Sequence, residues 1–564
     1  MGEEGGGRSC GTTRELQKLK QQALEYYREN DVPRRLEELL NSTFYLQPAD
    51  VYGHLANCFS KLAKPPTIYK VVGKNVLDGL GLPTLQVEIF CTIQNFPKSI
   101  CSVVISTHFE VHENALPELV EAEEVERADA VSTAVQWVNE TITEELRGIE
   151  PSNQAGVDQV LRIFFENKVQ EDKERKELEK SLEDSTVPVP SPLTQPPPPP
   201  LPPDKKKGQK QGRRDTFTEK PILPPEPDEH VLCGSMAIGA VSLAVAKTGA
   251  MLDGHPLYLN IALLKHHQEQ PAKLTLPLLM VSLVSCGKAS PGKLNLMKEL
   301  ICIPHPGLTA KQVLSQIFSK QKPIMEEIFV YIPPLEYISL LSNSNTPVKE
   351  NESKGKYEVM MGTYKNAAEM VDLYVDLINK FPSIIALIDP FRKEDSEPWD
   401  SIYDALGARC YLIAGTASKS ISKLLEDGNI GVLKYSGLII KHTNQTTMSD
   451  LVEITNLMDS KKHIAVFGST EGESSDDSLV DLAVGLGVRF IKLGGLSRGE
   501  RVTKYNRLLT IEEELVQNGT LGFTEEHTFF YLNEEAEKAA VAGELPEPLE
   551  LIFPTEVLEE STRT

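Results

Sequence analysis

The sequence lacks the paired cysteines that mark zinc sites and disulfide frameworks. Zinc modules and disulfide-stapled secreted domains place cysteines at close, repeated spacings, and no CxxC motif occurs here. We therefore expect free thiols, with neither a zinc site nor disulfides. The eight cysteines are scattered along the chain: Cys10, Cys58, Cys91, Cys101, Cys233, Cys286, Cys302 and Cys410.

Positive charge is also scarce, because 58 Lys and Arg residues face 81 Asp and Glu residues, a net charge of −23. Such a balance repels nucleic acid and anionic membranes. No run of 18 apolar residues is present, and the first ten residues contain no apolar signal-peptide stretch. We expect a cytoplasmic protein that binds neither nucleic acid nor membrane.

A length of 564 residues predicts three or four domains. Changes in composition and hydrophobic pattern set the boundaries between them. We divide the chain into a helical docking hairpin at residues 14–66, an α+β domain in two parts at 67–167 and 231–270, a disordered insertion at 168–230, a barrel at 271–540 and an acidic tail at 541–564.

The insertion is rich in proline and lysine: it begins with the charged helix candidate EDKERKELEKSLED and continues with the runs PVPSPLTQPPPPPLPP and DKKKGQKQGRR. Such a composition cannot bury enough surface to offset chain entropy. The proline run is either a stiff spacer or a ligand for an SH3- or WW-type groove. The lysine-rich run is either a solvated linker, a contact for an acidic surface or a nuclear-localisation-like stretch.

The hairpin consists of two short amphipathic helices on either side of Pro48, and Asp50 is the expected cap of the second helix. Two helices of this length cannot bury their apolar stripes alone, so a second copy of the chain is one way to cover them. Packing on the protein's own body is the other. The run PADVYGHLANCFSKL resembles the dimerization and docking hairpins of regulatory kinase subunits and flagellar proteins. This resemblance implies a homo-oligomer and a flagellar or cytoskeletal partner for residues 14–66.

The C-terminal half alternates short apolar runs with helical patterns. Such alternation indicates βα units on a parallel sheet, and because no GxGxxG opens the first helix, we predict a (β/α)8-type barrel within an α/β protein. The runs are SIIALID, RCYLIAG, SGLIIKH, HIAVFGS and VRFIKLG.

Barrel sites lie at the C-terminal ends of the strands. Lys441 and Lys492 each end an apolar run, and Asp389 ends another. Two lysines in one cavity can have different roles, because one can remove a carbon-bound proton while the other binds an anion. Surface lysines on loops are the alternative.

Several segments resemble the enolase family. The runs LIDPF, SGLIIKHTNQ and VDLAVGLGVRFIKLGGLSRGERVTKYNRLLTIEEEL are similar to its C-terminal barrel, and GLPTLQVEIF and MAIGAVSLAVAKTGA to its N-terminal domain. The resemblance implies dehydration of 2-phosphoglycerate, a glycolytic step. Lys441 falls on the family's proton acceptor, whereas Glu299 and Lys492 fall on substrate-binding positions.

The family's Mg²⁺ ligands are not matched. Two carboxylate positions read Ile388 and Ala414, and the third falls on Ile332 or Pro333. The substrate histidine aligns with Ser290, and the phosphate-holding run with residues 469–471. Because Mg²⁺ requires oxygen ligands, we expect no intact metal site and at most a weak lyase of the phosphopyruvate hydratase type.

Two hypotheses follow. In the first, Glu299, Glu336 and Asp389 rebuild a metal site and the protein is a working enzyme. In the second, the barrel is a non-catalytic scaffold that docks through its N-terminal hairpin. The hairpin and the insertion resemble those of a divergent sperm branch of the family, which implies a cytoplasmic, flagellum-associated component of glycolysis or structure that supports motility.

Overall fold

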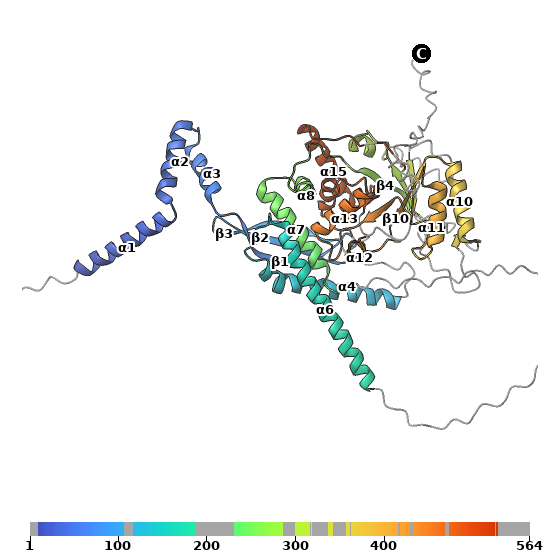
Figure 1. Ribbon diagram of the computed structural model, residues 1–564, viewed down its shortest axis with the longest axis horizontal. Coiled ribbons are helices and arrows are strands. Elements are labelled where there is room, and N and C mark those ends of the chain that lie inside the picture. The colour runs from blue at the N-terminus through green and yellow to red at the C-terminus, as the bar shows by residue number, and fades with distance from the viewer. Residues whose placement is uncertain are drawn as a thin grey trace, which may run out of the picture. The chain divides into compact units, whose positions relative to one another are not determined.

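The computed structural model divides into two compact units (Figure 1). One comprises Met1–Thr67 with Cys91–Lys98, and the other comprises Ile68–Phe90 with Ser99–Thr564. The residues described are 9–106, 117–186, 231–285, 299–315, 317, 337–341, 357–360, 363–415, 418–428, 434–468, 473–524, 526–527 and 529.

The first unit contains three helices, α1 (Ser9–Glu29), α2 (Val32–Leu46) and α3 (Val51–Leu62). The Asp50 carboxylate caps α3, because it accepts a hydrogen bond of 2.9 Å from the Gly53 backbone N–H. The two predicted helices and this cap are confirmed, whereas α1 was not predicted. Thr43 is the one buried residue among the described side chains of these helices, so the described parts of the three helices enclose no hydrophobic core.

The N-terminal part of the second unit is α+β, as predicted. Its antiparallel sheet has the order β1–β2–β3, and the alternating residues of β2 that face inward are fully buried. The strands are β1 (Thr67–Leu77), β2 (Pro83–Ile93) and β3 (Phe96–Val104). The helices are α4 (Pro117–Trp137), a π-helix at Val138–Ile142, α5 (Thr143–Glu145), α6 (Gln154–Thr186), α7 (Met236–Asp253) and α8 (Leu257–Lys265).

The charged helix candidate at the start of the predicted insertion is confirmed, and it belongs to a longer helix that crosses the predicted boundary at residue 168. Helix α6 continues without interruption to Thr186. Its charged C-terminal half is supported by ion pairs one turn apart, such as Lys168 with Glu171 at 2.7 Å and Lys176 with Asp172 at 2.8 Å. Residues 187–230, with the proline and lysine runs, and the tail at 541–564 lie outside the described residues.

Helix α7 is long and apolar enough to cross a membrane by length and composition, which differs from the expectation of no such span. However, 78% of this helix is buried inside the protein. Small residues such as Gly239, Ala240 and Ala244 let neighbouring segments approach it closely. Its composition is therefore that of a core helix.

The C-terminal part forms a closed barrel with the strand order β10–β11–β12–β13–β4–β5–β6–β9. The strands are β4 (Leu278–Ser285), β5 (Glu299–Ile303), β6 (Tyr337–Leu341), β9 (Ile384–Ile388), β10 (Tyr411–Ala414), β11 (Gly437–Ile440), β12 (Ile464–Gly468) and β13 (Phe490–Gly494). The helices are α10 (Ala367–Lys380), α11 (Ser396–Leu406), α12 (Ile421–Asp427), α13 (Met448–Ser460), α14 (Ser478–Gly485) and α15 (Gly499–Gln517), and α10 and α11 lie side by side on one flank (Figure 1).

The five apolar runs are the parallel strands β9 to β13, as predicted. The (β/α)8-type pattern is wrong at β5, which is antiparallel to both β4 and β6. The 13 residues between β4 and β5 are close to the shortest crossover that joins a parallel pair, whereas an antiparallel pair needs no crossover. A separate hairpin pairs β7 (Tyr357–Met360) with β8 (Thr363–Lys365).

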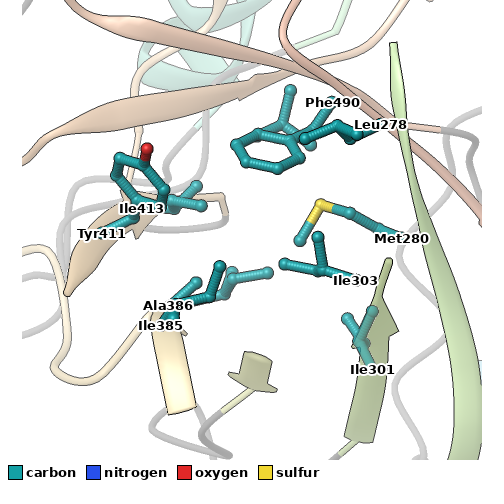
Figure 2. Packing of buried hydrophobic residues seen from close by; sticks show 11 residues of the cluster. Leu278, Met280, Ile301, Ile303, Ile385, Ala386, Tyr411, Ile413 and Phe490 are labelled. Carbon is teal, nitrogen blue, oxygen red and sulfur yellow. The ribbon is translucent and has the colours of Figure 1, made fainter. Parts of the chain in front are cut away.

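Apolar side chains from the barrel strands converge on its interior (Figure 2). Met280, Ile303, Ile413 and Phe490 contribute from four different strands and are each no more than 3% exposed. Phe529, from the chain after α15, packs on the same cluster, and its ring lies 4.6 Å from that of Tyr411. The barrel interior is therefore a packed core rather than a channel.

Candidate functional site at the C-terminal ends of the barrel strands

The barrel brings the two predicted lysines to one end. Ile440 of β11 pairs with Phe467 of β12, and Phe467 pairs with Ile491 of β13, so Lys441 and Lys492 lie at the same level with one strand between them. Strands lie about 4.8 Å apart, which places the two lysine backbones about 10 Å from each other. The residue two positions before each lysine faces the barrel interior. Because side chains two positions apart on a strand point to the same face, both lysine side chains point toward the open end of the barrel at the C-terminal ends of its strands, which we call the barrel mouth.

Glu299 also reaches this mouth. It begins β5, and its carboxylate oxygen Oε2 lies 2.8 Å from Lys492 Nζ. The two side chains are 13% and 23% exposed, so water screens this ion pair only partly. The structure thus brings together the two residues predicted to bind substrate.

Ser282 is a site residue that the sequence analysis missed. It lies on β4, and its hydroxyl donates a hydrogen bond to Glu299 Oε1. One carboxylate oxygen is therefore held by a serine and the other by a lysine, which fixes the orientation of Glu299. The alternating run LLMVSLVS was the available signal, because its strand pattern places Ser282 on the same face as Met280.

This arrangement can bind an anion and move a proton. Lys492 supplies a positive charge at the mouth, and Lys441 places a second amine near it. Glu299 offsets part of that charge. A lysine pair with one carboxylate suits a small phosphorylated or carboxylated substrate, with one amine as base and the other as anion ligand.

The two positions that we predicted to match Mg²⁺ ligands of the enolase family carry residues that do not fit Mg²⁺. Ile388 and Ala414 are both 0% exposed, and Ile388 belongs to the barrel core. Neither side chain has an oxygen, and Mg²⁺ requires oxygen ligands at near-octahedral geometry. Within the described ranges, no group of three or more His, Cys, Asp or Glu side chains could hold a metal ion.

Among the described residues, Asp389 belongs to no group of side chains that could hold a metal ion. It follows β9 with a φ of 49°, and its Oδ1 accepts a hydrogen bond of 2.8 Å from the Gly415 backbone N–H. Both Glu299 oxygens are already engaged by Ser282 and Lys492. These bonds give Asp389 a role in joining β9 to β10. The other positions considered for metal or substrate, Ser290, Ile332, Pro333, Glu336 and residues 469–471, lie outside the described residues.

A small cavity of about 30 Å³ lies beside the mouth. Its lining includes Ser106 after β3, His442 after Lys441, Gly468 at the end of β12, and Lys504 from α15. The space suffices for a water molecule but not for a phosphorylated substrate. The described cavity therefore lies next to the candidate site but is too small to be its substrate pocket.

His442, which directly follows Lys441, makes stability depend on pH. Burial lowers the pKa of His442 to about 4 from an ordinary value of 6.5. The unfolded chain takes up a proton as the pH falls below 6.5, whereas the folded chain resists until about pH 4, so stability falls across this window. We expect His442 to contribute about 3 kcal/mol to this loss, measured by urea unfolding at a series of pH values.

The variant His442→Gln should flatten this pH dependence. His255→Gln, at an exposed histidine, is the matched control and should retain the slope of the unchanged protein. If His442→Gln and the unchanged protein lost stability in parallel between pH 6.5 and 4, the assignment to His442 would be wrong.

Comparisons with known proteins agree with this geometry. Residues 348–528 match the family described as "Enolase, C-terminal TIM barrel domain". The chain is similar to Enolase 4 of Homo sapiens, with 72% identity over 620 positions covering 100% of this chain and 99% of the human protein, and to Enolase 4 of Mus musculus, with 63% identity over 100% of both.

A more distant relative is Cytosolic enolase 3 of Arabidopsis thaliana, which is 24% identical over 87% of this chain and 96% of the plant protein. The human alignment is longer than the 564-residue chain, so it includes positions at which this chain has no residue. The two mammalian relatives are similar to this chain over nearly its whole length, and their identity to it is high enough to assign its family. This chain belongs to the enolase family.

Proposed function

We propose that this protein is an enolase-fold component of a glycolytic or structural assembly in the sperm flagellum, and that its phosphopyruvate hydratase activity is weak. The observation that carries the proposal is the contrast at the barrel mouth. Lys441, Lys492 and Glu299 are present there, whereas the ligand positions are occupied by the buried side chains of Ile388 and Ala414. A cytoplasmic, flagellum-associated location is part of this proposal.

The retained residues support binding of the substrate anion. Lys492 and Lys441 can attract a carboxylate or a phosphate, and Ser282 with Glu299 keeps Lys492 in position. Deprotonation next to a carboxylate, however, builds a second negative charge on the same carbon skeleton. Lysine alone offsets little of that charge compared with a divalent cation.

We expect isothermal titration of the full chain with Mg²⁺, in the presence of 2-phosphoglycerate, to show no saturable heat. The described residues offer no complete set of oxygen ligands, and Mg²⁺ is reluctant to give up its water shell. An enolase that retains its metal-binding carboxylates is the positive control under the same conditions.

A saturable isotherm with about one Mg²⁺ per chain would contradict the proposal. The variant Asp389→Asn would then test the rebuilt site directly, because it removes one carboxylate charge and keeps the side-chain shape. Loss of the heat in that variant would favour the first hypothesis, in which unaligned acids hold the metal.

The alternative function is a non-catalytic scaffold that docks through residues 14–66. Exposed apolar side chains on the helices favour it, since Leu16 is 67% exposed, Leu24 61% and Tyr52 86%. A flagellar or cytoskeletal protein is the partner we infer for this surface. Residual turnover that depends on Lys441 would separate the weak enzyme from the pure scaffold.

A further inference from the structure

Helix α3 carries a histidine and a cysteine whose reactive atoms face each other. His54 Nε2 and Cys58 Sγ lie 3.6 Å apart, and both side chains are half-buried. The residues are four positions apart, which places them on the same face of the helix one turn from each other. Cys58 forms no disulfide.

The distance between these two atoms matches one edge of a tetrahedral zinc site. Zinc binds cysteine sulfur at about 2.3 Å and histidine nitrogen at about 2.0 to 2.1 Å. At the tetrahedral angle, those two bond lengths separate sulfur from nitrogen by about 3.6 Å. The separation of the two atoms therefore allows both to bind one zinc ion.

One copy supplies only half of such a site. Structural zinc is four-coordinate, and no group of three or more candidate ligands occurs in the described part of one chain. A two-fold axis that passes through the metal would add the same histidine and cysteine from a second copy. The product is a Cys₂His₂ set, which is a common structural zinc site.

A second copy also suits the surface around this pair. The described side chains of α1, α2 and α3 enclose no core, and helices this short are marginally stable in water unless something covers their apolar faces. Large apolar side chains on α2 and α3 remain 39% to 70% exposed: Leu36, Leu40, Phe44, Val51, Phe59 and Leu62.

The charges on these two helices do not oppose self-pairing. The whole chain is strongly acidic, at −23, so most of its surface repels another copy. The segment from Val32 to Leu62 is balanced by contrast, because its cationic residues are Arg34, Arg35 and Lys61 and its anionic residues are Glu37, Glu38 and Asp50.

We propose that two copies of this chain pair through α2 and α3 and share one zinc ion between the two His54–Cys58 pairs. The zinc holds the two α3 helices in register while the apolar side chains bury one another. The CxxC spacing rule did not reveal this site, because each copy contributes a histidine and a cysteine one helical turn apart. The inference does not depend on the catalytic state of the barrel.

The test uses the full chain in a non-thiol reductant, with the metal removed by EDTA and then replaced by Zn²⁺ or Co²⁺. Analytical ultracentrifugation should show that metal drives association, with one ion bound per two chains. Co²⁺ should give the absorption of tetrahedral cobalt with thiolate ligands. Cys58→Ser and His54→Gln should each weaken metal binding by more than about a hundredfold, whereas Cys233→Ser, at an exposed cysteine outside α3, should change nothing.

Three results would overturn the proposal. A mass that does not respond to metal, together with the absence of thiolate–cobalt absorption, would assign the His54–Cys58 contact to a weak hydrogen bond. One metal ion per chain without association would exclude a shared site. Metal binding that survives Cys58→Ser but is lost in Cys233→Ser would place the site elsewhere. Mg²⁺ and 2-phosphoglycerate are absent from this experiment, so its outcome is independent of the proposed function.

Discussion

Supplied with Mg²⁺ and 2-phosphoglycerate, the purified full-length chain is expected to form phosphoenolpyruvate more than about a thousandfold more slowly than an enolase that retains its metal-binding carboxylates. The cause is the pair Ile388 and Ala414, which present no oxygen to a cation. A loss of about 5 kcal/mol of transition-state stabilisation already gives this factor, since 1.36 kcal/mol corresponds to tenfold in rate. Absorbance of the enol product measures it directly.

Variants at two lysines make this experiment decisive. Lys441→Ala removes the expected proton acceptor and should abolish any residual turnover. Lys423→Ala, at an exposed lysine on α12, is the matched control and should leave that turnover unchanged. Turnover within about tenfold of the reference enolase, lost in Lys441→Ala, would refute a weak enzyme.

The second large effect concerns the stability of the barrel. Lys504 of α15 is 1% exposed, and its Nζ lies 3.1 Å from Oε2 of Glu473, which is 2% exposed. The same Nζ donates hydrogen bonds to the backbone oxygens of Ser474 and Glu500. We expect Lys504→Ala to lower the free energy of unfolding by about 3 to 5 kcal/mol, because it removes one ion pair of the buried Glu473 carboxylate and leaves that carboxylate its ion pair with Arg501.

Urea unfolding followed by circular dichroism measures this change. Lys419→Ala is the matched control, because Lys419 pairs with Asp427 at 2.7 Å while both side chains are nearly half exposed. A surface pair of this kind contributes about 1 kcal/mol or less. If the two variants lost the same stability, burial would not be what makes the Glu473–Lys504 pair important.

The parallel part of the barrel could be predicted because each of its strands is recognisable from the residues of its own short segment. Runs such as SIIALID and SGLIIKH are short and apolar, and capped helices separate them. Strand β5 could not be predicted in the same way, because its direction depends on pairing with β4 and β6 and not on its own residues. The charged end of α6 was recognised as a helix candidate but was assigned to the disordered insertion, because a charged composition indicates solvent exposure in a helix as well as in a disordered segment.

The candidate site, like the fold, could be predicted only in part from the sequence. Lys441, Lys492 and Glu299 could be named from the family resemblance, and the position of each lysine at a strand end could be read from the hydrophobic pattern. The contact between Glu299 and Lys492 could not be predicted from the sequence, because strands β5 and β13 lie on either side of β4 only once the barrel has closed. Ser282 was missed because its strand lacks the flanking helical pattern that identified the other strands.

The burial of Ile388 limits how a metal site could be built at this position by substitution. Ile388 is fully enclosed among the apolar side chains of the barrel. A single substitution to glutamate would place an unpaired carboxylate in that core before other ligands exist to share a cation with it. Such a variant would therefore be less stable than the present protein and would gain no metal-dependent catalysis in return. Several substitutions would have to be made together before a bound cation could offset the cost of burying the new carboxylate.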